Sequence, residues 1–311
     1  MANTYLNSTK IMEVDVLLAT KNGGTYINEF LDSLKKQNKV KINLIVSDDA
    51  STDETLKVIE SHRGSFNDVL IFSGPQKGPK ENFFYLLQHA KSMYIAFADQ
   101  DDIWHPDHLI ASIAVMNKHS SSPTLVFSQC EEFRDAIAIG RFPKTNFQPT
   151  LEKFIFSNYA RGCTMVFNNL LLKKIKIDEK NAIMHDWWLA LVAFLCGNVV
   201  YIESCHIRYR LHDRNFVGLG GTRLEKILNL LRVFRLGVWN PLVQINALYS
   251  AYPEEFKLMQ SSDITKKLLQ TQQTGNFISR FKFASKTKGF RPDFLEDLIV
   301  RMLLLRSWKI S

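Results

Sequence analysis

Four short apolar runs in the first hundred residues alternate with three segments of helical periodicity, and this alternation limits the fold more than any other feature. The apolar runs are rich in β-branched or aromatic residues and cover 14–19, 42–47, 69–72 and 94–98. The helical segments cover 26–36, 53–62 and 80–91. Such a series predicts an α/β fold with a mixed, mostly parallel sheet flanked by helices. Ligands of such sheets gather at the carboxyl ends of the strands.

Length and composition indicate a folded chain without a membrane span. The 311 residues, 46% of them apolar, suffice for one large domain with an appendage or for two modest domains. No long uncharged apolar run appears, and the first dozen residues lack the basic start and apolar stretch of a signal peptide. The four cysteines have no metal-ligand spacing and suit a reducing compartment. We therefore expect a cytoplasmic protein without disulfides.

The excess positive charge lies in the C-terminal region. From Thr222 onward 15 basic residues face 7 acidic ones, which accounts for the whole formal net charge of +8. Apolar residues between 224 and 234 recur at helical spacing with basic residues among them. This predicts an α/β domain over 1–220 and a basic helical extension over 221–311. The extension either rests on the anionic inner face of the cell membrane or packs on the domain with a solvated basic face. No nucleic-acid motif accompanies the charge, so nucleic acid is not an expected partner.

Polar segments follow the first two predicted strands. The first strand ends in ATKNGG at 19–24, which can bring a ligand close to the backbone but is more often an ordinary turn. The second ends in SDDASTD at 47–53, where Ser51 and Glu54 have the spacing of a capping box. Asp48 and Asp49 have no such explanation, because adjacent carboxylates repel each other unless a hydrogen-bond donor lies beside them. A base N–H or a ribose hydroxyl would supply that donor.

Three carboxylates, those of Asp99, Asp101 and Asp102, lie within four residues at the end of the fourth predicted strand. Their burial would be costly unless they faced solvent or a cation. Mg²⁺ or Mn²⁺ prefers oxygen ligands and is often held by one or two carboxylates together with substrate phosphates. The alternative is an exposed acidic turn before a helix that follows Pro106. The position after a buried strand favours the cation site.

Six segments in this order resemble the family 2 glycosyltransferases: ATKNG (19–23), DDASTD (48–53), DQDDIW (99–104), GCTMVF (162–167), HDWW (185–188) and YRLHDRN (209–215). The resemblance covers residues 12 to 217. It implies the GT-A fold, which is Rossmann-like, and an inverting hexosyl transfer from a nucleotide diphosphate. Within the family the chain is similar to bacterial rhamnosyltransferase-like enzymes of surface polysaccharide assembly. The expected donor is therefore dTDP-rhamnose or a UDP-hexose, and the expected acceptor is a glycan or a lipid-linked glycan.

The resemblance also implies residue roles in donor binding. By this likeness Asp49 holds the nucleotide base, and the loop containing Thr20 and Asn22 lies alongside it. Asp99 begins an Asp-x-Asp pattern and lies near the ribose and the metal. These assignments come from the matched motifs, since each loop alone is a weak signal.

The same resemblance implies a metal site. Asp101 binds Mn²⁺ or Mg²⁺ directly, and His212 matches a position where some members supply a further metal ligand or a diphosphate contact. Without the family, a lone histidine in YRLHDRN is more often structural or exposed. Arg161, Arg210 and Arg214 are further candidates for the diphosphate, although surface arginines usually meet only water.

Asp186 is the predicted general base. Inversion by direct displacement requires the acceptor hydroxyl to attack opposite the departing nucleotide, and a carboxylate within hydrogen-bond reach can take its proton. The metal neutralises charge on the leaving diphosphate, so no protonated acid is needed there. Alternatively, Asp186 caps a helix whose Trp187 and Trp188 enter the core. The same tryptophans could also offer a flat apolar face to a sugar ring.

Two departures and two other function classes remain. Ala50 stands where the family often has glycine, and His185 stands where many members have glutamate, so donor or acceptor preference can differ. A nucleotidyltransferase would also join metal carboxylates to an α/β scaffold, but its Gly-rich, Lys-bearing phosphate loop is not evident. A catalytically silent nucleotide-binding or assembly protein of the same fold is the third class. Retention of Asp101, Asp186 and His212 argues against it.

Overall fold

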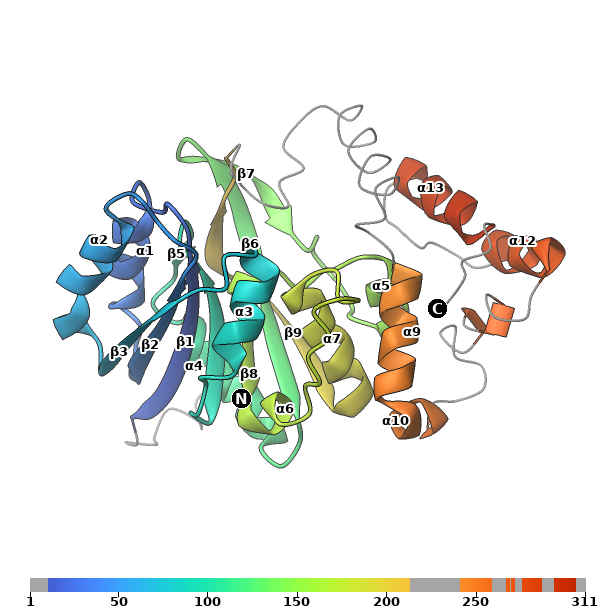
Figure 1. The fold of residues 1–311 in the computed structure, drawn as a ribbon, viewed down its shortest axis with the longest axis horizontal. Helices are drawn as coiled ribbons and strands as arrows, with labels where there is room; N and C mark the ends of the chain where they lie inside the picture. The colour runs from blue at the N-terminus through green and yellow to red at the C-terminus, as the bar shows by residue number, and fades with distance from the viewer. Residues whose placement is uncertain are drawn as a thin grey trace.

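The computed structural model describes residues 11–212, 241–258, 267–268, 270–271, 276–286 and 294–305. A nine-stranded sheet forms its centre, with the strand order β3-β2-β1-β4-β8-β6-β9-β5 and β7 paired to β6 (Figure 1). The mixed α/β architecture predicted from the sequence is confirmed.

The first half of the sheet is the predicted parallel series. Its strands are β1 (Met12–Thr20), β2 (Val40–Asp48), β3 (Asp68–Ser73) and β4 (Tyr94–Asp99). They are mutually parallel, with β1 between β2 and β4 and with β3 outside β2. The connecting helices are α1 (Ile27–Leu34), α2 (Thr55–Ser61) and α3 (Pro79–Leu87). All seven elements fall on the segments that periodicity predicts.

The second half adds antiparallel pairs, which make the sheet mixed. Its elements are β5 (Ile103–Trp104), α4 (His108–Met116), β6 (Thr124–Arg134), β7 (Ile137–Phe142), α5 (Leu151–Phe156), β8 (Met165–Asn168), α6 (Asn169–Leu172), α7 (His185–Cys196) and β9 (Asn198–Arg210). The strand β8 lies antiparallel between β4 and β6, whereas β9 is parallel to β6. The two-residue strand β5 pairs with β9, with Ile103 opposite Arg208. This pairing brings the segment after β4 beside the end of β9.

Both faces of the central strands of the sheet are buried. Side chains alternate along β1, so Val16 and Leu18 join one apolar cluster while Leu17 joins the other. Helices α1 and α4 cover the first cluster, and α3, α5 and α7 cover the second. The four cysteines are free thiols. Burial on both faces leaves the strand ends as the place where polar side chains meet solvent.

Four C-terminal helices are described: α9 (Pro241–Ala251), α10 (Pro253–Leu258), α12 (Phe277–Lys286) and α13 (Phe294–Leu304). Apolar residues of α9, including Leu242, Ile245 and Leu248, belong to the cluster that also contains α7. No described helix has the length and apolarity that a membrane crossing requires. The helix predicted over 224–234 lies outside the described residues.

Candidate active site

The loops after β1 and β2 are joined by hydrogen bonds at the carboxyl edge of the sheet. The Asn22 backbone N–H donates to Ser51 Oγ at 2.8 Å, and the Thr52 N–H donates to Asn22 Oδ1 at 2.8 Å. The Gly23 N–H donates to Thr55 Oγ1, also at 2.8 Å. Asn22 has a φ of 48°, a left-handed conformation that asparagine tolerates well. Asn22, which the sequence predicts to border the sugar donor, therefore holds the β1 and β2 loops together.

Asp48 has a structural role that the sequence does not reveal. Its carboxylate accepts the Thr20 hydroxyl at 2.8 Å, and it accepts both the N–H and the hydroxyl of Ser51, at 2.8 and 2.5 Å. The predicted capping box is wrong, because α2 begins after Glu54 with no side-chain cap and Ser51 turns back to Asp48 instead. Thr20 is buried and reaches the site through this bond to Asp48.

Asp49 is 2% exposed and is satisfied by backbone groups of the loop after β3. Its Oδ1 accepts the Gln76 N–H at 2.9 Å, and its Oδ2 accepts the Gly78 N–H at 3.0 Å. The two adjacent carboxylates do have hydrogen-bond donors beside them, as expected, but these donors are protein groups and not a base N–H or a ribose hydroxyl. Each carboxylate oxygen retains a further lone pair, so contact between Asp49 and a nucleotide base stays a prediction.

We expect Gly74→Ala to destabilise this part of the site. A Cβ at Gly74 would lie 2.4 Å from Asp49 Oδ1 and 3.0 Å from the Asp48 carbonyl oxygen, so the loop or the carboxylate must move. Overpacking of this kind costs about 1–3 kcal/mol. The unfolding temperature and the affinity for the nucleotide should both be lowered. The matched control is Gly64→Ala, whose Cβ would meet nothing within 4 Å; an equal loss in both variants would contradict the packing argument.

Gln100 links the β1 loop to the β4 loop. Its Oε1 accepts the Lys21 N–H and its Nε2 donates to the Lys21 carbonyl, each at 3.1 Å. This residue lies between Asp99 and Asp101, and no sequence signal marks it as functional. Through Gln100 the three loops after β1, β2 and β4 form one continuous wall.

The carboxylates after β4 differ in environment. Asp99 is partly exposed, and burial together with Asp101 and Asp186 raises its pKa to about 8. Asp102 is buried, accepts the Arg210 N–H at 3.0 Å, and has a pKa well above its ordinary value because of burial and the neighbouring carboxylates. Bringing these groups together is unfavourable without a positive partner.

Asp101 and His212, the two predicted metal ligands, lie together. His212 Nε2 is 2.6 Å from Asp101 Oδ2, although the residues are far apart in sequence. The imidazole stacks on the Tyr26 ring, with 5.2 Å between centroids and 19° between planes. The pairing of β5 with β9 produces this approach, because it places the end of β9 beside the β4 loop.

The side chains of Asp101 and His212 are suitable ligands for a divalent cation. Carboxylate oxygens and one imidazole are ligands that Mn²⁺ accepts and that Mg²⁺ accepts in part. Among the described residues, one group of three, Asp99, Asp102 and Cys163, has ligand atoms within 4.8 Å of one another. Its thiol is soft and Asp102 already binds a backbone N–H, so this group suits a hard cation less well. Asp101 and His212, whose carboxylate oxygen and imidazole nitrogen lie 2.6 Å apart, supply ligand types that suit such a cation better.

Arg161, a candidate for the diphosphate, is partly buried and already paired within the protein. Its Nη2 pairs with Glu132 at 2.6 Å, and its guanidinium lies over the rings of Tyr209 and Phe142, 4.1 and 4.5 Å from their centroids. Its charge opposes the upward shift of the Asp99 pKa. Arg161 therefore balances the carboxylates from within the wall of the site.

Arg210 fixes the Asp-x-Asp loop. Its Nε donates to the Asp101 carbonyl at 2.9 Å, and its Nη2 pairs with Glu29 at 2.5 Å. These contacts give the side chain a structural role in holding Asp101. The third candidate, Arg214, lies outside the described residues.

Asp186, the predicted base, lies in the first turn of α7, near the carboxylate of Asp99. Its Oδ2 accepts the Gly162 N–H at 3.1 Å, and its Oδ1 accepts the Trp187 N–H at 2.7 Å. Burial raises its pKa to about 6, while these N–H groups and the Asn158 side chain oppose the shift. Its charge in turn raises the pKa of Asp99. The structure thus brings Asp186 and the predicted metal carboxylates into one site.

The transfer rate should fall as the pH drops through about 6. A carboxylate accepts a proton only when ionised, and burial places the pKa of Asp186 at about 6 instead of its ordinary 3.8. The measurement is kcat/KM against pH at saturating metal. An acid limb near 3.8 would show that the Asp186 carboxyl keeps its ordinary pKa in the site, and the absence of an acid limb would show that its ionisation does not limit transfer.

His185, which departs from the commoner family pattern, is a neutral core residue. Its ring stacks on Phe83 with centroids 3.9 Å apart, and burial lowers its pKa to about 3. A Cβ added to Gly162 would lie 3.1 Å from His185 Nε2. The imidazole thus packs beneath the segment whose N–H holds Asp186.

The two tryptophans after Asp186 do not offer a face to a sugar. Trp187 and Trp188 are 4% and 0% exposed, and their indole N–H groups donate to the carbonyls of Phe154 and Lys176. The expectation of a sugar platform is wrong, and the alternative that they enter the core is confirmed. The burial of both indole rings, each with its N–H satisfied by a carbonyl oxygen, explains the result.

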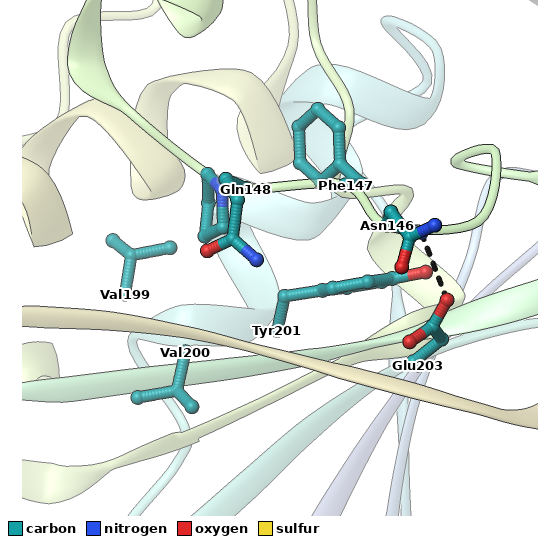
Figure 2. Close-up of a pocket in the computed structure, with 8 residues that line it drawn as sticks. Asn146, Phe147, Gln148, Val199, Val200, Tyr201 and Glu203 are labelled. Carbon is teal, nitrogen blue, oxygen red and sulfur yellow. Dashed lines mark hydrogen bonds between the residues drawn. The ribbon is translucent and has the colours of Figure 1, made fainter.

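A cavity of about 420 Å³ lies between β9 and the segment before α5. Figure 2 shows the Tyr201 ring beneath Phe147 and Gln148, and the Asn146 N–H donates to Glu203 Oε1 at 2.8 Å. Phe147 also packs on Tyr159, with 4.7 Å between ring centroids. None of the residues predicted to bind the sugar donor or the metal lines this cavity. Nothing in the sequence indicates that the cavity exists.

The fold and these strand-end loops match one family. Residues 15–175 match the model of Glycosyl transferase family 2, so the chain belongs to this family and is a glycosyltransferase. A relative in Shigella flexneri, dTDP-rhamnosyl transferase RfbG, is 32% identical over 217 residues, which are 65% of this chain and 73% of that protein. The Escherichia coli UDP-Glc:α-D-GlcNAc-diphosphoundecaprenol β-1,3-glucosyltransferase WfgD is 27% identical over 75% of this chain and 89% of that protein.

Solved structures support the GT-A fold. Staphylococcus aureus TarS 1–349 in complex with UDP-GlcNAc has a TM-score of 0.55 at 18% identity, over 88% of this chain and 81% of that chain. The mannosyltransferase PcManGT from Pyrobaculum calidifontis, in complex with GDP-Man and Mn²⁺, has a TM-score of 0.56 at 16% identity, over 95% and 87%. At these identities the likeness concerns the fold alone.

Proposed function

We propose that this chain is a metal-dependent inverting enzyme of bacterial surface polysaccharide synthesis. It moves a sugar from dTDP-rhamnose or a UDP-hexose to a glycan or lipid-linked acceptor. The convergence of Asp101, His212 and Asp186 at one sheet edge carries the proposal. The names of RfbG and WfgD support the donor and acceptor classes.

In this mechanism, each residue has one task. Asp186 accepts the proton of the attacking hydroxyl, and the Gly162 and Trp187 N–H groups hold its carboxylate in place. Asp101 and His212 would hold Mn²⁺ or Mg²⁺, and Asp99 would lie near the metal and the ribose. The cation supplies neutralisation of the charge that develops on the leaving diphosphate.

The donor side is the wall formed by the loops after β1, β2 and β4. In the proposal Asp49 contacts the nucleotide base, and the segment from Thr20 to Asn22 borders it. The hydrogen bonds that join these loops fix the wall before a donor arrives, which reduces the ordering cost of binding.

The experiment that tests the donor site is a thermal-shift panel of UDP, dTDP, GDP and CMP, each with and without Mn²⁺ or Mg²⁺. A ligand that binds only the native state raises the unfolding temperature. Metal-dependent stabilisation by dTDP supports rhamnose, and stabilisation by UDP supports a hexose or N-acetylhexosamine. No stabilisation by any nucleotide at millimolar concentration would overturn the proposal.

Turnover assays distinguish the proposed glycosyltransferase from the other two function classes. A silent protein of this fold would bind a nucleotide without metal-dependent turnover of any sugar donor, and a nucleotidyltransferase would release diphosphate from a nucleoside triphosphate. The proposal includes an α/β domain that ends near residue 220, followed by a helical extension. It also includes a cytoplasmic location.

A further inference from the structure

The helices α12 and α13 pack against each other and leave apolar side chains exposed. Their inner residues join the core cluster of the molecule: Ala284, Val300 and Leu304. On α12 itself, next to the buried Ala284, Phe277, Ile278 and Phe281 are 58%, 60% and 54% exposed. Three large apolar side chains on one arc of a helix are therefore each more than half exposed.

This arc is bordered by positive charge. Positions advance by about 100° per residue around a helix, so the exposed side chains of Lys282 and Lys286 lie beside Ile278 on the solvent side. The segment 277–286 contains no acidic residue. On α13, Leu298 and Met302, spaced i and i+4, add exposed apolar surface. We name the surface formed by Phe277, Ile278, Phe281, Lys282 and Lys286 the α12 face.

We propose that the α12 face docks on an anionic lipid surface. Apolar side chains beside lysines on a short helix match an interfacial helix, which buries its apolar arc at the headgroup boundary while its cations meet lipid phosphates. A contact with the α12 face of a second copy of this chain is less favourable than a lipid surface. A two-fold contact would bring Lys282 and Lys286 toward their own copies with no acidic residue of α12 to pair them, and like-charge contacts are costly.

This docking goes beyond the proposed transfer reaction and depends on neither donor nor metal. The helices α12 and α13 lie at the opposite end of the molecule from α1 and α2 (Figure 1). An enzyme held at a lipid surface by this end would meet a lipid-linked acceptor at a raised local concentration, so the face and the proposed acceptor class are compatible.

The test is co-sedimentation of the full chain with vesicles, without nucleotide or metal. Vesicles rich in phosphatidylglycerol are compared with vesicles of phosphatidylcholine alone. The variants are Phe277→Asp/Phe281→Asp and Lys282→Glu/Lys286→Glu. Matched controls are Ile139→Asp, at an isoleucine that is 57% exposed on β7, and Lys57→Glu on α2, where the lysine side chain is 81% exposed.

The wild-type chain should bind the anionic vesicles, and less so at high salt. The phenylalanine pair should weaken this binding at least about tenfold, and each lysine should contribute about fivefold. Both controls should bind as the wild type does. Circular dichroism and the unfolding temperature without nucleotide verify that each variant is folded.

Several results would overturn the lipid assignment: equal binding to both vesicle types, unchanged binding by both pairs of variants, or equal loss in the controls. A change of oligomeric state in the phenylalanine variant, without any vesicle binding by the wild type, would instead make the face a contact between copies. Because the assay contains no donor, its failure leaves the proposed transfer activity untouched.

Discussion

Asp186→Asn should lower kcat by about a thousandfold and leave nucleotide affinity nearly unchanged. The amide cannot take a proton from the acceptor hydroxyl, and a positioned general base contributes about 10²–10⁴ to the rate. Donor groups bind on the loops after β1, β2 and β4 in the proposed arrangement, so their contacts survive. Single-turnover transfer with a soluble acceptor gives the rate, and thermal shift with the donor nucleotide gives the affinity.

The substitution also has a structural cost that must be separated from the chemistry. In the native site both carboxylate oxygens accept backbone N–H groups, from Gly162 and Trp187. An asparagine has one acceptor oxygen, so one N–H loses its partner, at a cost of about 1–3 kcal/mol. Asn158→Ala is the matched control, because it removes a hydrogen bond to Asp186 but keeps the base.

The two variants together decide the role of Asp186. Asn158→Ala should lower the unfolding temperature while retaining most of the transfer rate and shifting its acid limb to higher pH, since a hydrogen bond that favours the carboxylate is lost. Normal transfer by Asp186→Asn would remove Asp186 from the mechanism. Equal rate loss in both variants would assign Asp186 a positioning role only.

The first half of the fold was predictable because its signals are local. The strands β1 to β4 are apolar runs, with β1, β2 and β4 buried on both faces, and α1 to α3 carry helical periodicity, so each element is visible in a short window. The second half depends on long-range pairing. The strand β5 has two residues and forms only because β9 lies beside it, and the antiparallel insertion of β8 has no local signal.

The candidate site shows the same limit. Carboxylates after buried strands indicate where ligands gather, but the sequence does not show which protein groups satisfy them. Asp48 and Asp49 suggested a missing ligand, whereas donors from Ser51 and from the loop after β3 fill that role. The partners of Asp101 likewise come from the end of β9, beyond the reach of any local pattern.

Asp101→Asn should lower transfer about 10²- to 10³-fold and raise the metal concentration needed for nucleotide-induced stabilisation at least about tenfold. The substitution removes one negative charge but keeps the side-chain volume and a hydrogen-bonding group for His212. The Asp101 backbone carbonyl still accepts from Arg210, so the loop should keep its position. Asp135→Asn is the matched control, because Asp135 lies in the β6–β7 turn at a φ of 48°, which asparagine also tolerates.

A double-mutant cycle with His212→Ala tests whether Asp101 and His212 act on one ion. If both hold the same cation, the double variant should lose little more metal dependence than Asp101→Asn alone, since the effects of residues that act as a unit are not additive. Fully additive losses would assign the two side chains to separate tasks, with His212 contacting the diphosphate. An unchanged metal response in Asp101→Asn would remove Asp101 from the metal site. Because the nucleotide shift without metal serves as the baseline in every variant, loss of the metal is distinguished from loss of the donor.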